Sequence, residues 1–145
     1  MMRYRLLTRE ELEALEADVV QFLAESGVTA VDWESWKSNG DKRIEELLAA
    51  FSEQFWDRAT SKVHFLERTT GDETWLFALG DTEAKLIRCV VDPNTNQVTW
   101  YEGGKSYPEE ARGHEVFLLL EQGAHPVEEE RWIAVNSAKS GASLN

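Results

Sequence analysis

The sequence is poor in cysteine and has no long apolar segment. Cys89 is the only cysteine among 145 residues, so an internal disulfide is impossible and a metal site built mainly of thiolates is excluded. A single thiol is typical of a reducing compartment, which favours the cytoplasm. The longest apolar run is VFLLL at 116–120, far below the roughly 20 residues that span a bilayer. The arginines near the N-terminus precede no apolar segment, so we expect neither a signal peptide nor a membrane partner.

Basic residues are also scarce. The chain has 15 Lys and Arg against 27 Asp and Glu, a formal net charge of −12. The acidity is distributed, with a net charge of −7 over residues 1–73 and −5 over residues 74–145. Because binding to a phosphate backbone requires clustered Lys and Arg, we expect no direct contact with nucleic acid or with anionic membranes. The negative balance is compatible with a basic protein partner, although solubility is its more ordinary role.

The sequence lacks the spacing of known catalytic motifs. No Gly-x-Ser-x-Gly stretch is present, and the EGGK segment at 102–105 does not have P-loop spacing. The three histidines lack the i, i+4 pairing of zinc hydrolases. His64 and Glu67 would share a helical face, but they lie on opposite faces of the strand that we predict there. The sequence therefore predicts no catalytic residue, no cofactor and no metal site; if a metal were bound, its candidate ligands would be His64, Glu67 and His114.

Cys89 is a weak candidate nucleophile. It alternates with Ile87 and Val91 in the segment LIRCVVD, which places the three side chains on one strand face, predicted to be the core side. A buried thiol without a cationic neighbour keeps a high pKa and stays unreactive.

The N-terminal segment predicts a well-capped helix over residues 9–26. Thr8 is the expected N-cap, and Glu11 three residues later completes a capping box. The apolar residues that follow have helical spacing and form one stripe: Leu12, Leu15, Val19, Phe22 and Leu23. Gly27 supplies the left-handed residue at which the helix is expected to end.

Two further helices are expected before residue 60. Asp32 is the predicted cap of a short helix that carries Trp33 and Trp36 on adjacent turns. A longer helix is predicted from about residue 41 to residue 59, with an apolar stripe made of Ile44, Leu47, Leu48, Phe51 and Phe55. Two antiparallel helices whose stripes face each other bury both stripes, so we expect the first and third helices to pack together.

From residue 62 the pattern changes to short segments rich in β-branched and aromatic residues. Four strands are predicted, at residues 62–69, 74–80, 84–92 and 97–103. The turn segments TGDE, GDTE and DPNTN separate them and leave no room for crossover helices. This spacing favours an antiparallel meander.

The C-terminal part returns to helix. Pro108 is expected at the first helical position and Gly123 at the helix end. The RWIAV segment at 131–135 could form an additional edge strand, and residues 137–145 have nothing to bury and are expected to be loose. With no repeat and no linker, the sequence predicts one α+β domain over residues 1–136, with an N-terminal helical pair, a β-meander of about four strands, a C-terminal helix and that edge strand.

Three segments follow one another in a recognisable order: YRLLTREELEALEADVVQFLAESGV at 4–28, DW at 32–33 and LLAAFSEQFWDRATSKVHFLE at 47–67. This order resembles a family of small uncharacterised proteins from the Bacteroidetes lineage, whose members tend to share a Tyr-Arg-x-Leu-Thr-x-Glu-Glu-Leu start, an Asp-Trp step and a Phe-Ser-x-x-x-Trp helix. About the first 70 residues match well, EVFLLLEQGA at 115–124 echoes a second shared helix, and residues 70–105 do not match. The resemblance implies a cytosolic bacterial protein without a described activity, and it supplies no catalytic residues.

Aromatic residues are the informative excess, with six tryptophans in 145 residues. Trp56 lies beside the stripe of the third helix, and Trp75 shares a strand face with Phe77, so all three are predicted to be core. Five other aromatic residues are candidate binding anchors: Trp33, Trp36, Trp100, Tyr101 and Tyr107. Trp100 and Tyr101 are adjacent on a strand and face opposite ways, so at least one is expected at the surface. Trp33 and Trp36 could instead simply cover the helical pair.

The sequence favours a non-catalytic, acidic protein-interaction module that meets a more basic protein through these aromatic side chains. Its partner is predicted to be a protein, without direct contact to nucleic acid or membrane. Two alternatives stay open. One is a small metal-dependent or hydrolytic enzyme that uses His64, Glu67, His114 and nearby acids. The other is a nucleic-acid mimic that binds a basic protein, for which binding would collapse as the salt concentration rises.

Overall fold

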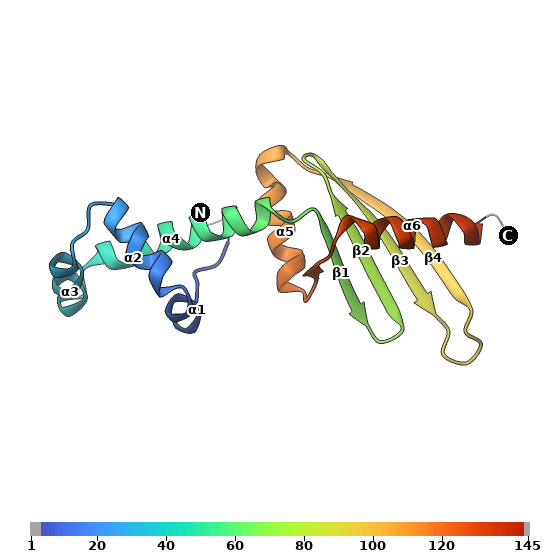
Figure 1. The fold of residues 1–145 in the computed structure, drawn as a ribbon, viewed down its shortest axis with the longest axis horizontal. Coiled ribbons are helices and arrows are strands. Elements are labelled where there is room, and N and C mark those ends of the chain that lie inside the picture. Colours follow the sequence, from blue (N-terminus) through green and yellow to red (C-terminus); the bar gives the residue numbers. More distant parts are fainter. Residues whose placement is uncertain (1–3, 144–145) are drawn as a thin grey trace. The chain divides into compact units, whose positions relative to one another are not determined.

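The computed structural model describes residues 4–143 and shows an α+β fold, which confirms the predicted class. The chain divides into two compact units, residues 1–58 and 59–145. In the first unit all regular elements are helices, and the second carries an antiparallel sheet together with helices (Figure 1). We call them the helical unit and the sheet unit. A single domain over residues 1–136 stays a prediction, because two compact units can still unfold together.

The helices of the first part of the chain are α1 (Arg9–Ala14), α2 (Glu16–Glu25), α3 (Ala30–Asn39) and α4 (Lys42–Ser61). The single helix expected over residues 9–26 is therefore interrupted. Leu15 has φ −107° and ψ 23°, outside helical values, and its N–H is shared between the carbonyl groups of Glu11 and Leu12 at 3.1 and 3.2 Å. The chain bends at this residue, and α1 and α2 are separate elements.

The predicted caps of this segment are confirmed. Thr8 Oγ1 accepts from the Glu11 N–H at 3.2 Å, and the Glu11 carboxylate accepts from the Thr8 N–H at 2.8 Å. At the other end Gly27 has φ 78°, and the Val28 N–H donates to the Leu23 carbonyl at 2.9 Å. This is the hydrogen bond that closes a helix behind a left-handed glycine.

The prediction that Asp32 caps α3 is wrong by three residues. Thr29 is the N-cap, with an extended backbone, and its hydroxyl accepts from the Asp32 N–H at 3.0 Å. Asp32 occupies the third helical position, where its carboxylate accepts from the Thr29 N–H at 3.3 Å. A second capping box therefore forms, because aspartate at this position reaches the same orphan donor as glutamate.

The helical unit has its core between α2 and α4. Phe22 and Phe51 pack edge to face with ring centroids 5.5 Å apart, which confirms that the two apolar stripes meet. An extended N-terminal segment also lies on α4. Its Leu7 N–H donates to Ser52 Oγ at 3.0 Å, and Trp56 Nε1 donates to the Arg5 carbonyl at 3.2 Å. These bonds satisfy backbone groups of a segment that has no regular structure of its own.

The sheet unit contains the predicted antiparallel meander, which is confirmed. Its strands are β1 (Phe65–Thr70), β2 (Glu73–Leu79), β3 (Glu83–Val91), β4 (Val98–Ser106) and β5 (His125–Pro126), in the spatial order β4-β3-β2-β1-β5 (Figure 1). The edge strand next to β1 is thus β5, and not residues 131–135 as expected.

Residues 131–135 belong to α6 (Glu129–Ser143). Trp132 and Val135 are half-buried while Ile133 and Ala134 are exposed, and this spacing of three is helical, whereas a strand would bury alternate residues. Residues 137–143, which were expected to be loose, continue the same helix. Residues 144–145 lie outside the described part of the chain.

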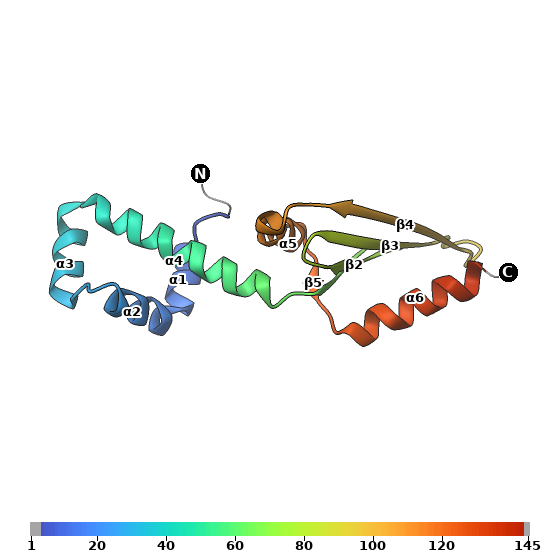
Figure 2. The same cartoon turned by 90° about the horizontal axis from the view of Figure 1, so that it is seen from above.

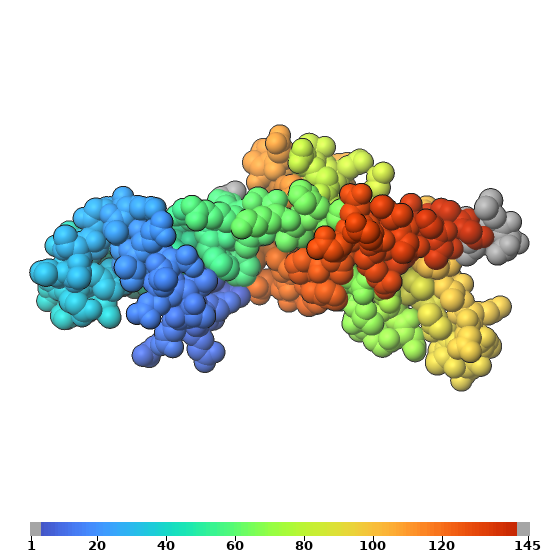
Figure 3. Space-filling model, in the orientation of Figure 1, coloured from blue at the N-terminus to red at the C-terminus, as the bar shows by residue number. Residues whose placement is uncertain are grey.

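Helices lie on both faces of the sheet. α6 crosses one face, with Trp132 against Phe65 (ring centroids 6.3 Å apart), Arg131 paired with Glu67 and Lys139 paired with Glu102 (Figures 1 and 2). In the space-filling view it covers the middle of the strands (Figure 3). α5 (Arg112–Glu121) lies on the opposite face, where Val116 and Leu66 form the centre of an apolar cluster.

The start of α5 differs from the prediction, and its end agrees with it. Pro108 is extended, with ψ 146°, and caps a single 3₁₀ turn, Glu109–Ala111, that precedes α5. Gly123 has φ 99° and ends the helix as expected. No helix among residues 4–143 is long and apolar enough to cross a membrane.

Arg112 fastens α5 to the rest of the sheet unit. Its guanidinium donates to four backbone carbonyl oxygens at 2.5 to 3.2 Å, those of Thr60, Val63, Leu79 and Gly80. The Tyr107 hydroxyl donates to the same Gly80 carbonyl at 2.6 Å. These carbonyl groups lie at the end of α4, just before β1, at the end of β2 and in the turn that follows it, so one side chain supplies donors to carbonyl groups at the ends of several elements.

Candidate functional site

Within residues 4–143 no strand pairs with the outer edge of β4. The Tyr107 N–H donates to the Thr82 carbonyl at 2.9 Å and the Asp92 N–H donates to the Gln97 carbonyl at 2.8 Å, and the β3–β4 register between them has no bulge. Backbone groups of an antiparallel strand alternate in direction, so the odd-numbered residues of β4 face β3. The backbone groups that face outward belong to Val98, Trp100, Glu102, Gly104 and Ser106.

The two edges of the sheet are protected differently. β5 has only two residues and includes Pro126, which has no N–H to offer. β4 has nine residues, and all but Trp100 are exposed. Edge strands usually avoid further pairing through proline, bulges, shortness or charged side chains. Of these devices β4 has only the charged residues Glu102 and Lys105, which are paired with Lys139 and Glu115. It therefore offers a row of backbone donors and acceptors to another extended segment.

Four side chains form a continuous row across the sheet, on the face opposite α6. Arg68, Trp75, Arg88 and Tyr101 lie directly opposite one another on β1 to β4. The guanidinium carbons of Arg68 and Arg88 lie 5.0 and 4.9 Å from the Trp75 ring, and that of Arg88 lies 4.8 Å from the Tyr101 ring. Alternation of cations and aromatic rings at these distances is stabilising. We call this row the ladder.

Glu73 fixes the middle of the ladder. Its carboxylate accepts from Arg88 Nη2 at 2.5 Å and from Trp75 Nε1 at 3.2 Å. The hydrogen bond from Arg88 holds the pKa of Glu73 below its usual value, and the same bond raises the pKa of Arg88. Trp75 and Arg88 are therefore held in one geometry and form a pre-organised surface.

Unlike Arg88, Arg68 does not donate a hydrogen bond to a carboxylate among the described residues. Its Nη1 donates to Gln122 Oε1 at 3.4 Å, and within residues 4–143 it has no carboxylate partner. Its Nε and that of Arg88 are buried among the described side chains without an acceptor. Tyr101, at the β4 end of the ladder, is 47% exposed.

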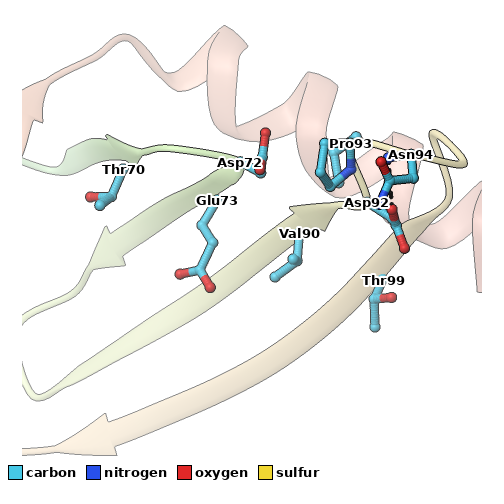
Figure 4. Close-up of a pocket in the computed structure, with 9 residues that line it drawn as sticks. Thr70, Asp72, Glu73, Val90, Asp92, Pro93, Asn94 and Thr99 are labelled. Atoms are coloured by element: carbon cyan, nitrogen blue, oxygen red, sulfur yellow. Dashed lines mark hydrogen bonds between the residues drawn. The ribbon is translucent and has the colours of Figure 1, made fainter.

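A shallow hollow of about 760 Å³ continues this face toward the hairpin turns. Figure 4 shows Glu73, Val90 and Thr99 on three neighbouring strands, with Asp72 and Asp92 at the turns. The Asp92 carboxylate accepts from the Asn94 N–H at 2.8 Å and thereby stabilises its own turn. No three His, Cys, Asp or Glu side chains among the described residues are arranged to hold a metal ion.

Of the five predicted anchors, Trp33 and Trp36 lie in the helical unit, and the other three lie in the sheet unit. Trp100 is half-buried on the α6 side of β4 and Tyr101 is exposed on the ladder side, as their alternation requires. Tyr107 is buried, which raises the pKa of its hydroxyl, and this hydroxyl holds the Gly80 carbonyl. Tyr107 is therefore a structural residue and does not form part of the surface.

Trp33 and Trp36 lie in the helical unit and are half-buried. The Arg43 guanidinium carbon lies 4.2 Å from the Trp36 ring centroid, and Arg43 also pairs with Asp41 at 2.8 Å. The hydrogen bonds from Arg43 lower the pKa of Asp41 to about 2. Trp36 is thus shielded by a local cation–π contact at the start of α4.

The candidate metal ligands do not form one site. Glu67 is on β1, where it accepts from Arg131 at 2.5 Å. His64 is exposed and precedes β1, and His114 is on α5, with its ring 6.4 Å from that of Phe117. Cys89 is half-buried on the same face as Ile87, as predicted, and burial raises the pKa of its thiol.

Sequence reasoning missed the ladder. Trp75 does share a strand face with Phe77, as predicted, but only Phe77 lies against the core cluster under α5. Trp75 stands between two arginines. The usable signal was the register: the turns fix which residues of β1 to β3 lie opposite one another, and Arg68, Trp75 and Arg88 coincide.

Comparison with known proteins identifies a family and no relative of known activity. A family model described as "Family of unknown function (DUF6495)" matches residues 2–96. No curated protein and no solved structure matches the chain. The matched part contains β1, β2 and β3 and ends before β4 begins at Val98.

Proposed function

The chain belongs to the family of unknown function DUF6495, and we propose that it is a non-catalytic protein-interaction module that binds an extended segment of a basic partner along β4. The observation that carries the proposal is the open β4 edge, with its outward backbone groups at alternate residues. Addition of a strand to such an edge is a common mode of peptide recognition, in which the backbone supplies affinity and the flanking side chains supply specificity.

The side chains beside this edge suit an alternating peptide. Tyr101 borders one face of the added strand and Trp100 the other. Gly103 and Gly104 leave the strand without side chains over two residues, so a partner backbone meets little steric hindrance there. Alternate residues of the bound segment would contact the ladder or the surface beside α6.

The charge of the sheet unit favours a basic segment. Residues 59–145 contain 14 acidic and 8 basic residues. Lys105, the only lysine of β4, is already paired with Glu115 at 2.8 Å. Asp72 and Asp92, which line the hollow at the hairpin turns of this face, have no ion pair within residues 4–143. Lys and Arg side chains on the partner would find these carboxylates at that end of the sheet, and they would accelerate association at low salt.

The test is selection of linear peptides of about ten residues, displayed from a random library, on the full chain. Binding of the selected peptides is then compared between Glu102→Pro and Glu102→Ala. Proline removes one outward N–H of β4 and no bond to β3, whereas alanine keeps that N–H and removes the same carboxylate, which pairs with Lys139. We expect the proline variant to weaken binding about tenfold or more and the alanine variant to retain it.

Amide hydrogen exchange gives a second readout. In the free protein the outward N–H groups of β4, such as those of Glu102 and Gly104, should exchange faster than those of Tyr101 and Gly103. Bound peptide should protect the first pair. Equal affinity of the proline and alanine variants, no protection, or no selected peptide would each reject the proposal.

The other interpretations of the sequence stay predictions. A nucleic-acid mimic would bind a basic protein through dispersed acids, so its affinity would fall steeply with salt and would be unaffected by Glu102→Pro. A metal-dependent or hydrolytic enzyme would retain a stoichiometric transition metal in elemental analysis. The cytoplasm as compartment and the Bacteroidetes as lineage are likewise predictions.

A further inference from the structure

The helical unit has an apolar groove of about 800 Å³ that the β4 proposal does not use. It is bordered by α1, α2 and α3, with one residue contributed by α4. Its apolar lining includes Leu12, Val19, Val20, Leu23, Trp33 and Leu48. Of these only Leu23 is buried, and Val20 is 60% exposed.

α2 carries apolar side chains on two sides. Phe22 packs on Phe51 of α4. Val20 is two residues earlier, and two helical steps of 100° place it on the opposite side of the helix. A helix that is apolar on both sides is usually packed from both sides. Among the described residues of the helical unit, the groove side is covered only in part, because Leu23 is buried and Val20 stays 60% exposed.

The charged side chains that line the groove are three acids and two bases: Glu13, Glu16, Glu34, Arg9 and Lys37. Arg9 is paired with Glu13 at 3.2 Å, and Lys37, the other base at the groove, lies 3.9 Å from Glu34. Glu16 also lines the groove and has no ion pair within the described residues.

We propose that this groove binds an amphipathic helix of a partner protein, with apolar residues at i, i+3 or i+4, and i+7 facing the groove and Lys or Arg at its border. The groove walls are helices, whose backbone groups are bonded internally, so an extended strand would find no backbone partners there. A helix instead packs its side-chain ridges between those of α2 and α3. α2 has ten residues, about 15 Å, which corresponds to about three turns of bound helix.

The probe is an amidated amphipathic peptide of about fourteen residues, with leucine at the groove-facing positions and lysine and alanine elsewhere. Two control peptides accompany it, one with glutamate in place of lysine and one with the same composition in scrambled order. Binding to the full chain is measured by calorimetry, and the contact region by amide chemical shifts. The ordered lysine peptide should bind and shift the amides of α2 and α3, and neither control should bind at the same concentrations.

Two valine substitutions provide a matched comparison. Val20→Gln places an amide in the groove, whereas Val31→Gln makes the same change at a valine of α3 that is 79% exposed and does not line the groove. We expect Val20→Gln to weaken binding of the lysine peptide about tenfold, the value of one buried valine, and Val31→Gln to leave it unchanged. Circular dichroism checks that both variants keep their helix content.

This inference stands apart from the strand-binding proposal, because Glu102→Pro should leave binding of the helical probe unchanged. Equal effects of Val20→Gln and Val31→Gln would overturn it. Binding of the scrambled peptide as tight as that of the ordered one would also overturn it, because attraction by dispersed acids would then explain the affinity. Absence of binding to the full chain would overturn it as well.

Discussion

In the helical unit the buried apolar side chains keep exposed fractions of 5 to 9%, as Phe51 and Trp56 do, and a segment without regular structure is tied to α4 by individual hydrogen bonds. In the sheet unit Leu66, Leu76 and Val116 exclude water almost completely, with exposed fractions of 0 to 1%. The sheet has helices on both faces, whereas no helix among residues 4–143 closes the groove beside α2. The same chain thus contains one tightly closed core and one that remains partly open.

The difference also determines what each unit leaves for a partner. Helices satisfy their backbone groups internally, so an incomplete helical assembly exposes apolar side chains, as Val20 does. A meander satisfies its backbone only through neighbouring strands, so its last strand exposes N–H and C=O groups, as β4 does. The two surfaces proposed for binding therefore differ in chemistry: the helical unit offers apolar side chains, and the sheet unit offers backbone N–H and C=O groups.

The largest effect should come from the closed core. Leu66→Ala removes a side chain with no exposure at the centre of the cluster under α5, and we expect it to reduce the free energy of unfolding by about 2–5 kcal/mol. Leu23→Ala is the matched change in the helical unit, where the side chain borders an open groove. It should reduce the free energy of unfolding clearly less than Leu66→Ala does, because water can fill the space that the leucine side chain leaves. Urea denaturation measures both. A cost for Leu23→Ala equal to that of Leu66→Ala would contradict the contrast between the cores.

Arg112 should produce the next largest effect. Arg112→Ala leaves four carbonyl groups without their shared donor, which should reduce the free energy of unfolding by about 1.5–3 kcal/mol. Arg112→Lys keeps the charge, but its single ammonium cannot replace a planar group with five donors. Most of the loss should therefore persist in the lysine variant. Full recovery with lysine would show that charge and not geometry matters at this position.

The parts of the fold that could be predicted are those determined by local chemistry. Thr8, Glu11 and Gly27 define a helix start and end within a few residues, because caps depend on side chains adjacent in sequence. The meander followed from the short turns between strands. The same local reasoning assigned the N-cap of α3 to Asp32, whereas the N-cap is Thr29. Both residue types are common N-caps, and only the backbone conformation decides between them.

The predictions that were wrong concern segments whose structure depends on contacts between residues distant in sequence. RWIAV has a composition compatible with a strand, and it is helical because Trp132 reaches Phe65 and Lys139 reaches Glu102 across the sheet. The role of Tyr107 depends on Gly80, which is 27 residues away. Propensity carries no information on such partners, so tertiary context overrides it.

The candidate site could be predicted only in part, because it too depends on contacts between residues distant in sequence. Alternation along β4 correctly separated Trp100 from Tyr101, but whether β4 is an edge strand depends on the strand order of the whole sheet. The ladder required the register of four strands at once. A single strand pattern cannot show which arginine lies beside which tryptophan.

A smaller effect is expected within the ladder. Trp75→Leu keeps an apolar residue on β2 and removes the ring between Arg68 and Arg88. A double-mutant cycle with Arg68→Met should yield a coupling free energy of about 0.5–1 kcal/mol. Arg68 has the simpler environment for this measurement, because it does not share Glu73 through a hydrogen bond as Arg88 does. A coupling near zero would mean that the four side chains stand side by side without stabilising one another.

The smallest effect is a pH dependence at the first helix. Hydrogen bonds from Arg5 and from the Thr8 N–H lower the pKa of Glu11 from 4.5 to about 2. A carboxyl group whose pKa is lower in the folded state contributes stability that is fully present above the unfolded-state pKa and is lost as the pH falls through the folded-state pKa. The contribution of Glu11 should therefore disappear between about pH 4.5 and pH 2. Since the Arg5–Glu11 pair is 36% exposed on both sides, solvent screening limits this contribution to a few tenths of a kcal/mol.

Glu11→Gln is the variant that isolates this charge, because glutamine can still accept from the Thr8 N–H and keep the capping box. Its free energy of unfolding should be lower than that of the unchanged chain at pH 6, and the difference should shrink toward zero as the pH approaches 2. Carbon-detected NMR titration of the Glu11 carboxyl should give a midpoint near 2. A midpoint near 4.5, or a difference between the two proteins that does not change with pH, would show that Arg5 does not hold this carboxylate in solution and that the N-terminal segment is anchored by its contacts with α4 alone.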